Sequence, residues 1–345
     1  LIAGDGIGAE VVPAARQVLE ALRPDLRFSE AAAGWATFQQ TGTALPESTL
    51  QAVRAADATL FGAVSSPLER VAGYRSPIVG MRRALNLYAC VRPVQSPPLA
   101  GSRPNIDIVV VRENTEGLYS GVETREGDER ATAQRVITRE ASEQIVRWAL
   151  GYAQAHGRRR ITVVHKANVL RETCGLFRET ALRVLADAGA IQVDEMLVDN
   201  AAYQLARSPE RFDVIVTTNL FGDILSDVAS VWGGGLGLAA SANYGPQSAI
   251  FEPVHGSAPD IAGRGCANPL ATFGAAGLLL EHIGDHAAAR KLRSAINTML
   301  HDGPHTPDLG GSATTDAVTN RCIHLIHEGH DTRDEYPHEG GDYQI

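Results

Sequence analysis

The sequence predicts an α/β fold, because short apolar runs typical of buried strands alternate with segments of helical periodicity. Connections that contain glycine separate these segments, as expected when strands and helices succeed one another along the chain. A chain of 345 residues can bury a large core and is expected to form one or two domains. The strand-like runs are residues 1–3, 58–63, 106–111, 161–164 and 212–218.

The first strand leads into a glycine-rich turn at residues 4–8 and then into a helix. The apolar side chains of this helix share one stripe, which predicts that the stripe faces the core. The glycines of the turn do not have the G-x-G-x-x-G spacing of a dinucleotide fingerprint, so we reject a Rossmann fold. The residues of the stripe are Val12, Ala15, Val18, Leu19 and Leu22.

The middle of the chain contains a helix and two irregular segments. Residues 138–156 are predicted to be helical, with Thr138 as N-cap and Gly157 as the stop. Residues 121–135 are polar and charged, so they are expected to leave the domain as an excursion. The four prolines between Pro93 and Pro104 suggest a crossover between domains, and the polar residues from about Glu328 suggest a loose tail.

Composition limits the classes of function. Hydrophobic residues make up 44% of the chain, which is typical of a soluble globular protein, and the net charge of −9 argues against nucleic-acid binding. No apolar run reaches membrane-spanning length. The four cysteines form neither a zinc pattern nor a disulfide framework, which favours a reducing compartment such as the cytoplasm. Because Leu1 already lies in a strand-like run, we expect residues to precede it. Whether these residues include a targeting segment that is removed stays open.

Asp223 and Asp227 form the most informative pair of the chain. They follow a strand and Gly222 at helical spacing i and i+4, so they should share one face of a helix. Two like charges at this spacing repel by a few tenths of a kcal/mol, so a positive group should lie beside them. Carboxylate oxygens suit Mg²⁺ or Mn²⁺. The alternative is a solvated acidic face, and Asp199, after another apolar run, could be a third metal ligand.

Three arginines stand in unusual places. Arg82 lies in a helical segment, whereas Arg92 and Arg112 are predicted at the ends of buried strands. Buried arginines are costly unless they are paired, and three of them suit a substrate with several carboxylates. The alternative, that each pairs with a structural Asp or Glu, stays open.

Two residues are candidates for acid–base chemistry, and one loop is a candidate for nucleotide binding. Lys166 follows a buried strand and could act as a base if its pKa is lowered, and Tyr119 could act as a general acid. The backbone of the small-residue loop 255–261 could approach a phosphate or a nucleotide closely. Taken singly, each of these features also has a purely structural interpretation.

Together, these motifs resemble those of the β-decarboxylating dehydrogenases, the isocitrate/3-isopropylmalate/homoisocitrate dehydrogenase family. The resemblance extends from Gly4 to Gly311, nearly the whole chain. The motifs that carry it are residues 112–119, 165–168, 219–227 and 252–260.

The resemblance implies an isopropylmalate dehydrogenase-like fold of two domains, with the active-site cleft between them. Residues 1–93 and 248–345 would form a large domain, and residues 94–247 a small one. The excursion at residues 120–137 resembles an arm that joins two subunits of a homodimer or tetramer. In such an assembly Lys166 and Asp199 would reach the active site of the partner.

The resemblance also implies the chemistry of the site. Mg²⁺ or Mn²⁺ would be held by Asp223, Asp227 and the partner subunit's Asp199. Lys166 would take the proton of the substrate hydroxyl while hydride passes to a nicotinamide, and Tyr119 would protonate carbon after loss of CO₂. The positions implied for substrate binding are Ser76, Val79, Arg82, Arg92, Arg112 and Asn168.

The expected cofactor is NAD. By resemblance, Asp260 and Ile261 lie beside the adenosine ribose, where relatives that use NADP carry a Lys-Tyr pair. A carboxylate accepts the ribose hydroxyl groups and repels a 2′-phosphate. The positions implied for cofactor binding are Asn114, Glu116, His255, Gly256, Ser257, Ala258, Asp260, Ile261 and Asn268.

The substrate is predicted from the segment 73–82, which looks like the matching stretch of homoisocitrate dehydrogenases. Ser76 could bind a distal carboxylate, and Ile78 stands where isocitrate enzymes usually carry Asn. Isopropylmalate enzymes carry a leucine-rich stretch here, and some bacterial homoisocitrate enzymes carry Arg at the position of Val79.

We therefore expect oxidation of homoisocitrate to 2-oxoadipate and CO₂, in lysine biosynthesis through 2-aminoadipate, with some activity on isocitrate. The alternatives are an isocitrate or a 3-isopropylmalate dehydrogenase. A more remote alternative is a non-catalytic regulatory subunit, although the catalytic and metal-binding positions of the family are retained.

Overall fold

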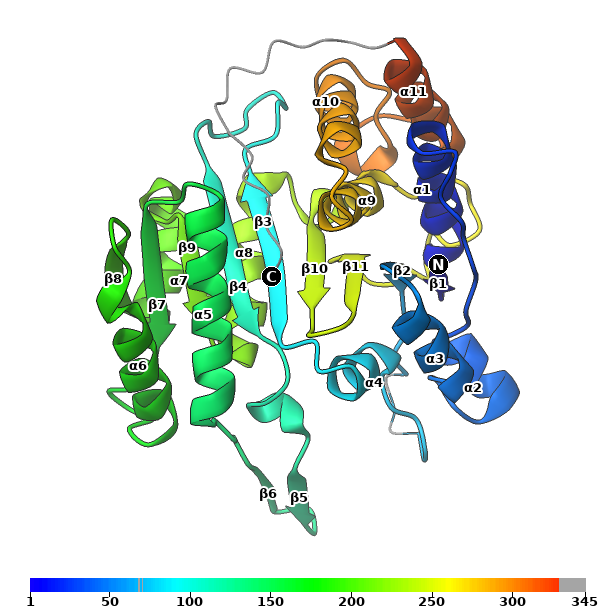
Figure 1. The fold of residues 1–345 in the computed structure, drawn as a ribbon. Helices are drawn as coiled ribbons and strands as arrows, with labels where there is room; N and C mark the ends of the chain where they lie inside the picture. The colour runs from blue at the N-terminus through cyan, green and yellow to red at the C-terminus, as the bar shows by residue number, and fades with distance from the viewer. Residues whose placement is uncertain (68, 70, 329–345) are drawn as a thin grey trace. The chain divides into compact units, whose positions relative to one another are not determined.

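The computed structural model describes residues 1–67, 69 and 71–328, and these residues form two compact units. The first unit contains residues 1–86 and 96–104 and the described residues from Gly233 onward, and the second contains residues 87–95 and 105–232. The helices and strands of the first unit are β1 (Ile2–Gly4), α1 (Gly8–Leu22), α2 (Trp35–Thr41), α3 (Glu47–Ala55), β2 (Thr59–Ala63), α4 (Pro77–Ala84), β10 (Ala240–Tyr244), β11 (Ala249–Pro253), α9 (Leu270–His282), α10 (His286–Asp302) and α11 (Thr315–Glu328) (Figure 1). Those of the second unit are β3 (Ala89–Gln95), β4 (Asp107–Glu113), β5 (Glu123–Glu126), β6 (Arg130–Ala133), α5 (Arg139–Ala155), β7 (Arg160–His165), α6 (Thr173–Val184), β8 (Gln192–Leu197), α7 (Val198–Arg207), β9 (Val214–Thr217) and α8 (Asn219–Ser230).

The first unit is built on strands in the order β1-β2-β11-β10. β1 and β11 run parallel to β2, and β10 is antiparallel to β11. Helices α1, α9, α10 and α11 pack on one another, with Leu19, Phe251, Phe273 and Leu292 in their core. The predicted apolar stripe of α1 is confirmed, since all of its members except Leu22 are fully buried.

The second unit is built on strands in the order β3-β4-β9-β7-β8. β4, β9, β7 and β8 are mutually parallel, and β3 is antiparallel to β4. Helices α5 and α6 cover one face of this sheet and α7 and α8 the other (Figure 1). Because Arg112 and Val164 both align with Thr217, the carboxyl ends of β4, β7 and β9 meet at one edge. The loops that follow these strands carry the candidate site.

The predicted helix at residues 138–156 is confirmed as α5. The hydroxyl of Thr138 accepts a hydrogen bond from the amide of Ala141 (3.2 Å), which is the expected N-cap. Gly157 adopts a left-handed backbone (φ +60°) just after the helix. Arg158, the residue after Gly157, forms ion pairs with Asp107 (2.8 Å) and Asp213 (3.1 Å).

The polar excursion is a two-stranded hairpin formed by β5 and β6, and every residue of both strands is exposed. Its role in joining subunits stays a prediction. The expected tail lies outside the described residues beyond Glu328. Within the described part of the chain, no helix has both the length and the apolar character needed to cross a membrane.

Candidate active site

Helix α8 places Asp223 and Asp227 on one face, as predicted from their spacing. The helix begins at Asn219, directly after β9, at the edge where the parallel strands end. A Cβ atom on Gly222 would lie 2.7 Å from the Cβ of Arg112. Glycine at this position therefore lets α8 approach β4 closely enough for the two elements to share a site.

Arg92 lies in the middle of β3, so the prediction that it ends a strand was wrong. β3 continues to Gln95 because it pairs with β4 along its whole length. The Arg92 Nη1 atom donates to the Ser226 hydroxyl (2.7 Å) and to Asp227 Oδ1 (3.2 Å). Its Nη2 atom lies 3.4 Å from Asp223 Oδ1. The guanidinium group therefore contacts both carboxylates.

Arg112 is the second cation of the site, and only 1% of its side chain is exposed. Its Nε and Nη2 atoms donate to Asn219 Oδ1 at 3.0 and 2.7 Å, and its Nη1 atom donates to Asp223. The positive charge expected beside Asp223 and Asp227 is thus supplied by two guanidinium groups. A divalent cation at this place stays a prediction.

Tyr119 lies in a 3-10 turn, Leu118–Ser120, beside these residues. Its hydroxyl donates to Asp223 Oδ2, and its ring lies 4.9 Å from the guanidinium carbon of Arg112. Burial, and then the contact with Asp223, raise the pKa of Tyr119. The phenol therefore stays protonated at neutral pH, as a general acid must.

Two carboxylates hold the turn that precedes Tyr119. The Glu113 carboxylate accepts hydrogen bonds from the amides of Thr115 (2.6 Å) and Glu116 (3.2 Å). The Glu116 carboxylate accepts from the amide and the hydroxyl of Thr138, both at 2.9 Å. Burial raises the pKa of Glu116 to about 7 although Thr138 acts in the opposite direction.

Asn114 and Glu116, predicted to contact the cofactor, serve the protein's own structure here. The Asn114 side-chain amide donates to the carbonyl of Leu87 (3.1 Å), and the carbonyl of Glu116 accepts from Asn219 Nδ2 (3.0 Å). Their contacts with a cofactor stay predictions.

Lys166 and Asp199 form a separate pair. Lys166 follows β7, Asp199 lies in the first turn of α7, and the ammonium group contacts the Asp199 carboxylate. This hydrogen bond is the main cause of the lowered pKa of Asp199. Among the described residues, no group of three or more His, Cys, Asp or Glu side chains is placed to hold a metal ion. One chain thus does not gather the three predicted metal ligands, and the nearby Asn168 is exposed.

The donor set nevertheless suits the predicted metal. Asp223 and Asp227 present only carboxylate oxygens, the ligands that Mg²⁺ and Mn²⁺ prefer. Burial is the main cause of the raised pKa of Asp227, with Arg92 acting against it and Asp223 adding to it. A cation bound to this pair would offset the cost of keeping both carboxylates charged.

The predicted substrate residues of the first unit lie on and beside α4. Arg82 Nη2 is 3.3 Å from Glu252 Oε1, and its Nε atom is buried with no hydrogen-bond partner in the described residues. A buried donor of this kind is suited to an anionic ligand. Ser76 holds the N-cap position of α4 without a side-chain capping bond, and Val79 is partly exposed.

The loop 255–261 has features that suit a nucleoside. The Nδ1 atom of His255 lies 3.0 Å from the carbonyl oxygen of Gly256, and its Nε2 atom is buried without a partner among the described residues. Burial lowers the pKa of His255, so the ring is neutral at pH 7. The Asp260 carboxylate is exposed, and Ala258 has a left-handed backbone (φ +39°) rare outside glycine. A neutral imidazole edge and a free carboxylate are groups that hydrogen-bond a base and a ribose.

The other predicted cofactor residues have structural partners as well. Ile261 packs beside Ile7 and Val11, and Ser257 is buried. The side-chain amide of Asn268 donates to Asp308 Oδ2 (2.9 Å), while its oxygen accepts from the amide of Leu270 (3.0 Å).

Sequence reasoning assigned no role to Asn219 or Ser226, both of which contact the arginines of the site. A signal for both was present. Positions 219, 223 and 226 are separated by four and three residues, so they share the face that carries the carboxylates. The role of Asp5, which anchors three backbone amides, had no such local signal.

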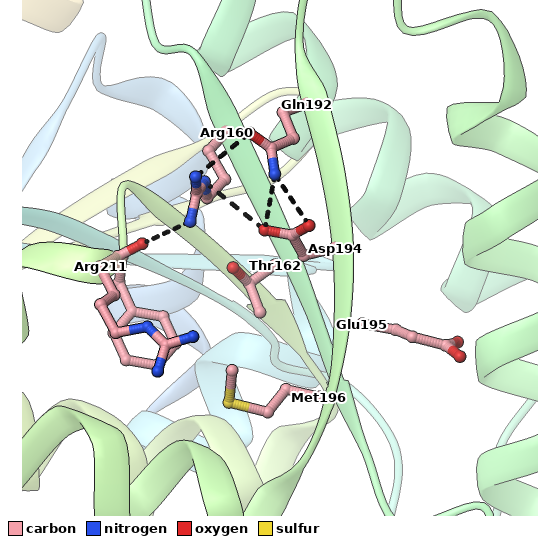
Figure 2. Close-up of a pocket in the computed structure, with 8 residues that line it drawn as sticks. Arg160, Thr162, Gln192, Asp194, Glu195, Met196 and Arg211 are labelled. Carbon is pink, nitrogen blue, oxygen red and sulfur yellow. Dashed lines mark hydrogen bonds and ion pairs between the residues drawn. The ribbon is translucent and has the colours of Figure 1, made fainter. Parts of the chain in front are cut away.

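A cavity of about 350 Å³ lies elsewhere in the second unit, beside β7 and β8 (Figure 2). Its polar groups bind one another: Arg160 donates to Gln192 (3.1 Å) and to the carbonyl of Arg211 (3.2 Å), and lies 3.5 Å from Asp194. None of the predicted site residues lines it. Its position and chemistry therefore do not make it a candidate for the active site.

Comparison with known proteins identifies the family. The family profile described as isocitrate/isopropylmalate dehydrogenase matches residues 1–325. The isocitrate/homoisocitrate dehydrogenase of Thermus thermophilus is 52% identical over 94% of this chain and 97% of its own. The 3-isopropylmalate dehydrogenase of Archaeoglobus fulgidus is 47% identical over 94% and 98%.

A solved structure confirms the predicted fold class. The crystal structure of isocitrate dehydrogenase from Methylococcus capsulatus superimposes with a TM-score of 0.90 at 43% identity, covering 94% of this chain and 98% of that one. The chain therefore belongs to the isocitrate/isopropylmalate dehydrogenase family of decarboxylating oxidoreductases and has the α/β fold of that family.

Proposed function

We propose that the protein is an NAD- and divalent-metal-dependent dehydrogenase that converts homoisocitrate to 2-oxoadipate and CO₂, with isocitrate as a second substrate. The observation that carries the proposal is the cluster of Arg92, Arg112, Tyr119, Asp223 and Asp227, joined by direct contacts. Its place would be the cytoplasm, in lysine biosynthesis through 2-aminoadipate.

The protein's own residues would bind the substrate through its carboxylates. Arg82, Arg92 and Arg112 are buried guanidinium groups, which bind carboxylates by paired hydrogen bonds. When bound, Mg²⁺ or Mn²⁺ on Asp223, Asp227 and the partner subunit's Asp199 supplies a Lewis acid, and NAD accepts a hydride. The cofactor would lie along residues 255–261, with Asp260 on the ribose.

Proton transfers fall to Lys166 and Tyr119. The Lys166 amine would accept the proton of the C2 hydroxyl as the substrate is oxidised. The Tyr119 hydroxyl would deliver a proton to carbon after CO₂ leaves, and its raised pKa supports this role because it keeps the phenol protonated. Asp223 accepts a hydrogen bond from that hydroxyl and so orients it.

A homodimer or a larger assembly would complete the site. Large exposed apolar side chains concentrate in the second unit, where their burial against a second copy would be favourable. They are Val122, Val136, Val169, Leu170, Tyr203, Ile224 and Val231. Two of them follow Lys166 closely and two flank the β5–β6 hairpin, which supports a subunit interface that also delivers Lys166 and Asp199 to the partner.

The choice of homoisocitrate rests on the segment 73–82 and is supported by the name of the Thermus thermophilus relative. Ser76 has a hydroxyl that no capping bond occupies, which suits a distal carboxylate. The name of the Archaeoglobus fulgidus relative makes 3-isopropylmalate the alternative to homoisocitrate as the main substrate.

The test is NADH production with Mg²⁺, comparing kcat/KM for homoisocitrate, isocitrate and 3-isopropylmalate. A lead for homoisocitrate supports the proposal. A higher kcat/KM for either other acid would retain the chemistry and refute the interpretation of Ser76, Ile78 and Val79 as residues that select homoisocitrate. If none of the three turns over, the regulatory-subunit alternative is favoured.

A further inference from the structure

Ser65 lies where three segments of the first unit meet. Its amide donates to Asp5 Oδ2 (2.9 Å), and its hydroxyl is 2.8 Å from the hydroxyl of Ser257. Its carbonyl accepts from the Tyr74 hydroxyl (2.8 Å). One residue thus contacts two segments. It contacts residues 255–261, the candidate nucleotide loop, through Ser257, and residues 73–82, the substrate-selecting segment, through Tyr74.

Asp5 fixes the position of Ser65. Asp5 is 7% exposed, and its carboxylate also accepts hydrogen bonds from the amides of Trp35 (2.7 Å) and Ala36 (2.9 Å). A Cβ atom on Gly34, whose φ is +126°, would lie 2.5 Å from Asp5 Oδ2, so any side chain there would collide with the carboxylate. Three backbone donors on one buried carboxylate leave Ser65 little freedom.

The nucleotide loop is also held against the turn at residues 4–8. The carbonyl of Ser257 accepts from the amide of Ile7 (2.9 Å). Gly6 has a left-handed backbone (φ +57°), and a Cβ atom there would lie 2.1 Å from that carbonyl oxygen. This close approach keeps the Ser257 hydroxyl within reach of Ser65.

The substrate-selecting segment is held through an aromatic cluster. The Tyr74 ring stands edge-on to Trp35 (5.3 Å between centroids, 78°) and to Phe38 (5.4 Å, 85°). Burial raises the pKa of Tyr74, so its hydroxyl stays a donor to Ser65 at neutral pH. A movement of Ser65 is therefore transmitted directly to the start of segment 73–82.

We propose that Ser65 is a positioning residue that couples the nucleotide loop to the substrate-selecting segment, so that a nucleotide on residues 255–261 orders residues 73–82. The roles of the two segments in binding NAD and substrate rest on the proposed function. The hydrogen bonds that carry the coupling are present in the protein without ligand. Loss of either of the two hydrogen bonds that link Tyr74, Ser65 and Ser257 should change the equilibrium constant for local opening about fivefold.

Amide hydrogen exchange of the ligand-free protein tests the coupling. The probes are the amides of Ile261, the last residue of the nucleotide loop, and of Ala262, the residue after it, which both donate to the carbonyl of Ala258 (3.1 and 3.2 Å). Tyr74→Phe, a change in the other segment, should accelerate their exchange about fivefold, but should have no further effect in a Ser65→Ala background. Ser29→Ala, which removes an exposed hydroxyl, is the control and should leave them unchanged. If Tyr74→Phe affects only residues near position 74, the coupling is refuted.

Addition of NAD separates this proposal from the proposed function. In the wild-type protein NAD should slow exchange at Ile261 and also at Gly80, whose amide bonds to the carbonyl of Ser76 (3.0 Å). Ser65→Ala should keep the first effect and lose most of the second. Protection at Ile261 with none at Gly80 in the wild type would overturn the coupling. An absence of protection at both would count against NAD as the cofactor, while the ligand-free experiment still decides the coupling.

Discussion

Replacing Asn219 with alanine would remove the group that joins the buried Arg112 to the turn before Tyr119. Asn219 is 1% exposed, and its side chain takes part in three hydrogen bonds. Two come from the Arg112 guanidinium (3.0 and 2.7 Å), and one goes to the carbonyl of Glu116 (3.0 Å). Asp223 would remain as a partner of Arg112, so the charge would keep one of its contacts.

The expected loss is about 3–5 kcal/mol of unfolding free energy, because a buried cation loses two acceptor contacts and a carbonyl loses its donor. With about 2.1 cal/mol/K of unfolding entropy per residue, a chain of this length should lose about 4–7 °C in Tm. The activity should fall as well, since Arg112 would no longer be held against the candidate substrate site.

Thermal unfolding followed by circular dichroism measures this loss. Asn320→Ala, at an exposed position of α11, is the matched control and should leave Tm almost unchanged. Asn219→Asp keeps an acceptor for Arg112 and loses the donor to Glu116, so it should lie between the wild type and Asn219→Ala. A Tm for Asn219→Ala within about 1 °C of the wild type would show that the three hydrogen bonds contribute little and would refute the argument.

Three further predictions address the metal, the pH dependence and the cofactor. Asp227→Asn should lower Mg²⁺-dependent NADH production about 100-fold or more, whereas Asp302→Asn, at an exposed site on α10, should leave it unchanged. Because burial raises the pKa of Glu116 from 4.5 to about 7, the folded state binds the proton more tightly than the unfolded state, and wild-type stability should fall as pH rises through this window. Tm measured at pH 5 and pH 8 should therefore fall less in Glu116→Gln than in the wild type, and an equal fall in both would contradict the raised pKa. Asp260→Ala should weaken the preference for NAD over NADP about tenfold in kcat/KM, and an unchanged ratio would remove Asp260 from cofactor selection.

Local patterns predicted much of the fold. The fold class, the α5 helix with its Thr138 cap, and the shared face of Asp223 and Asp227 follow from periodicity and capping, which depend on neighbouring residues. The resemblance of motifs extended these predictions to the family, which the comparisons confirm.

Features that depend on long-range pairing were harder to predict. Arg92 was predicted at the end of a buried strand, but pairing with β4 carries β3 through Pro93 and on to Gln95. The contacts of Arg92 with Asp227 join residues 135 positions apart, and no periodicity predicts a contact at that separation. The same holds for Asp5, whose carboxylate reaches the amide of Ser65 sixty residues away.

The order in which the two units are encoded has a consequence for synthesis on the ribosome. The described part of the second unit consists of residues 87–95 and one unbroken stretch, 105–232. In the first unit, by contrast, β2 pairs with β11, and Thr59 of β2 aligns with Ile250 of β11. The second unit can therefore fold while the chain is still growing, but β2 must wait for β11 to emerge, and until then its buried side chains need protection. We expect nascent chains released before residue 249 to aggregate through the exposed β2 edge, and a chaperone that covers this strand to raise the yield of the native protein.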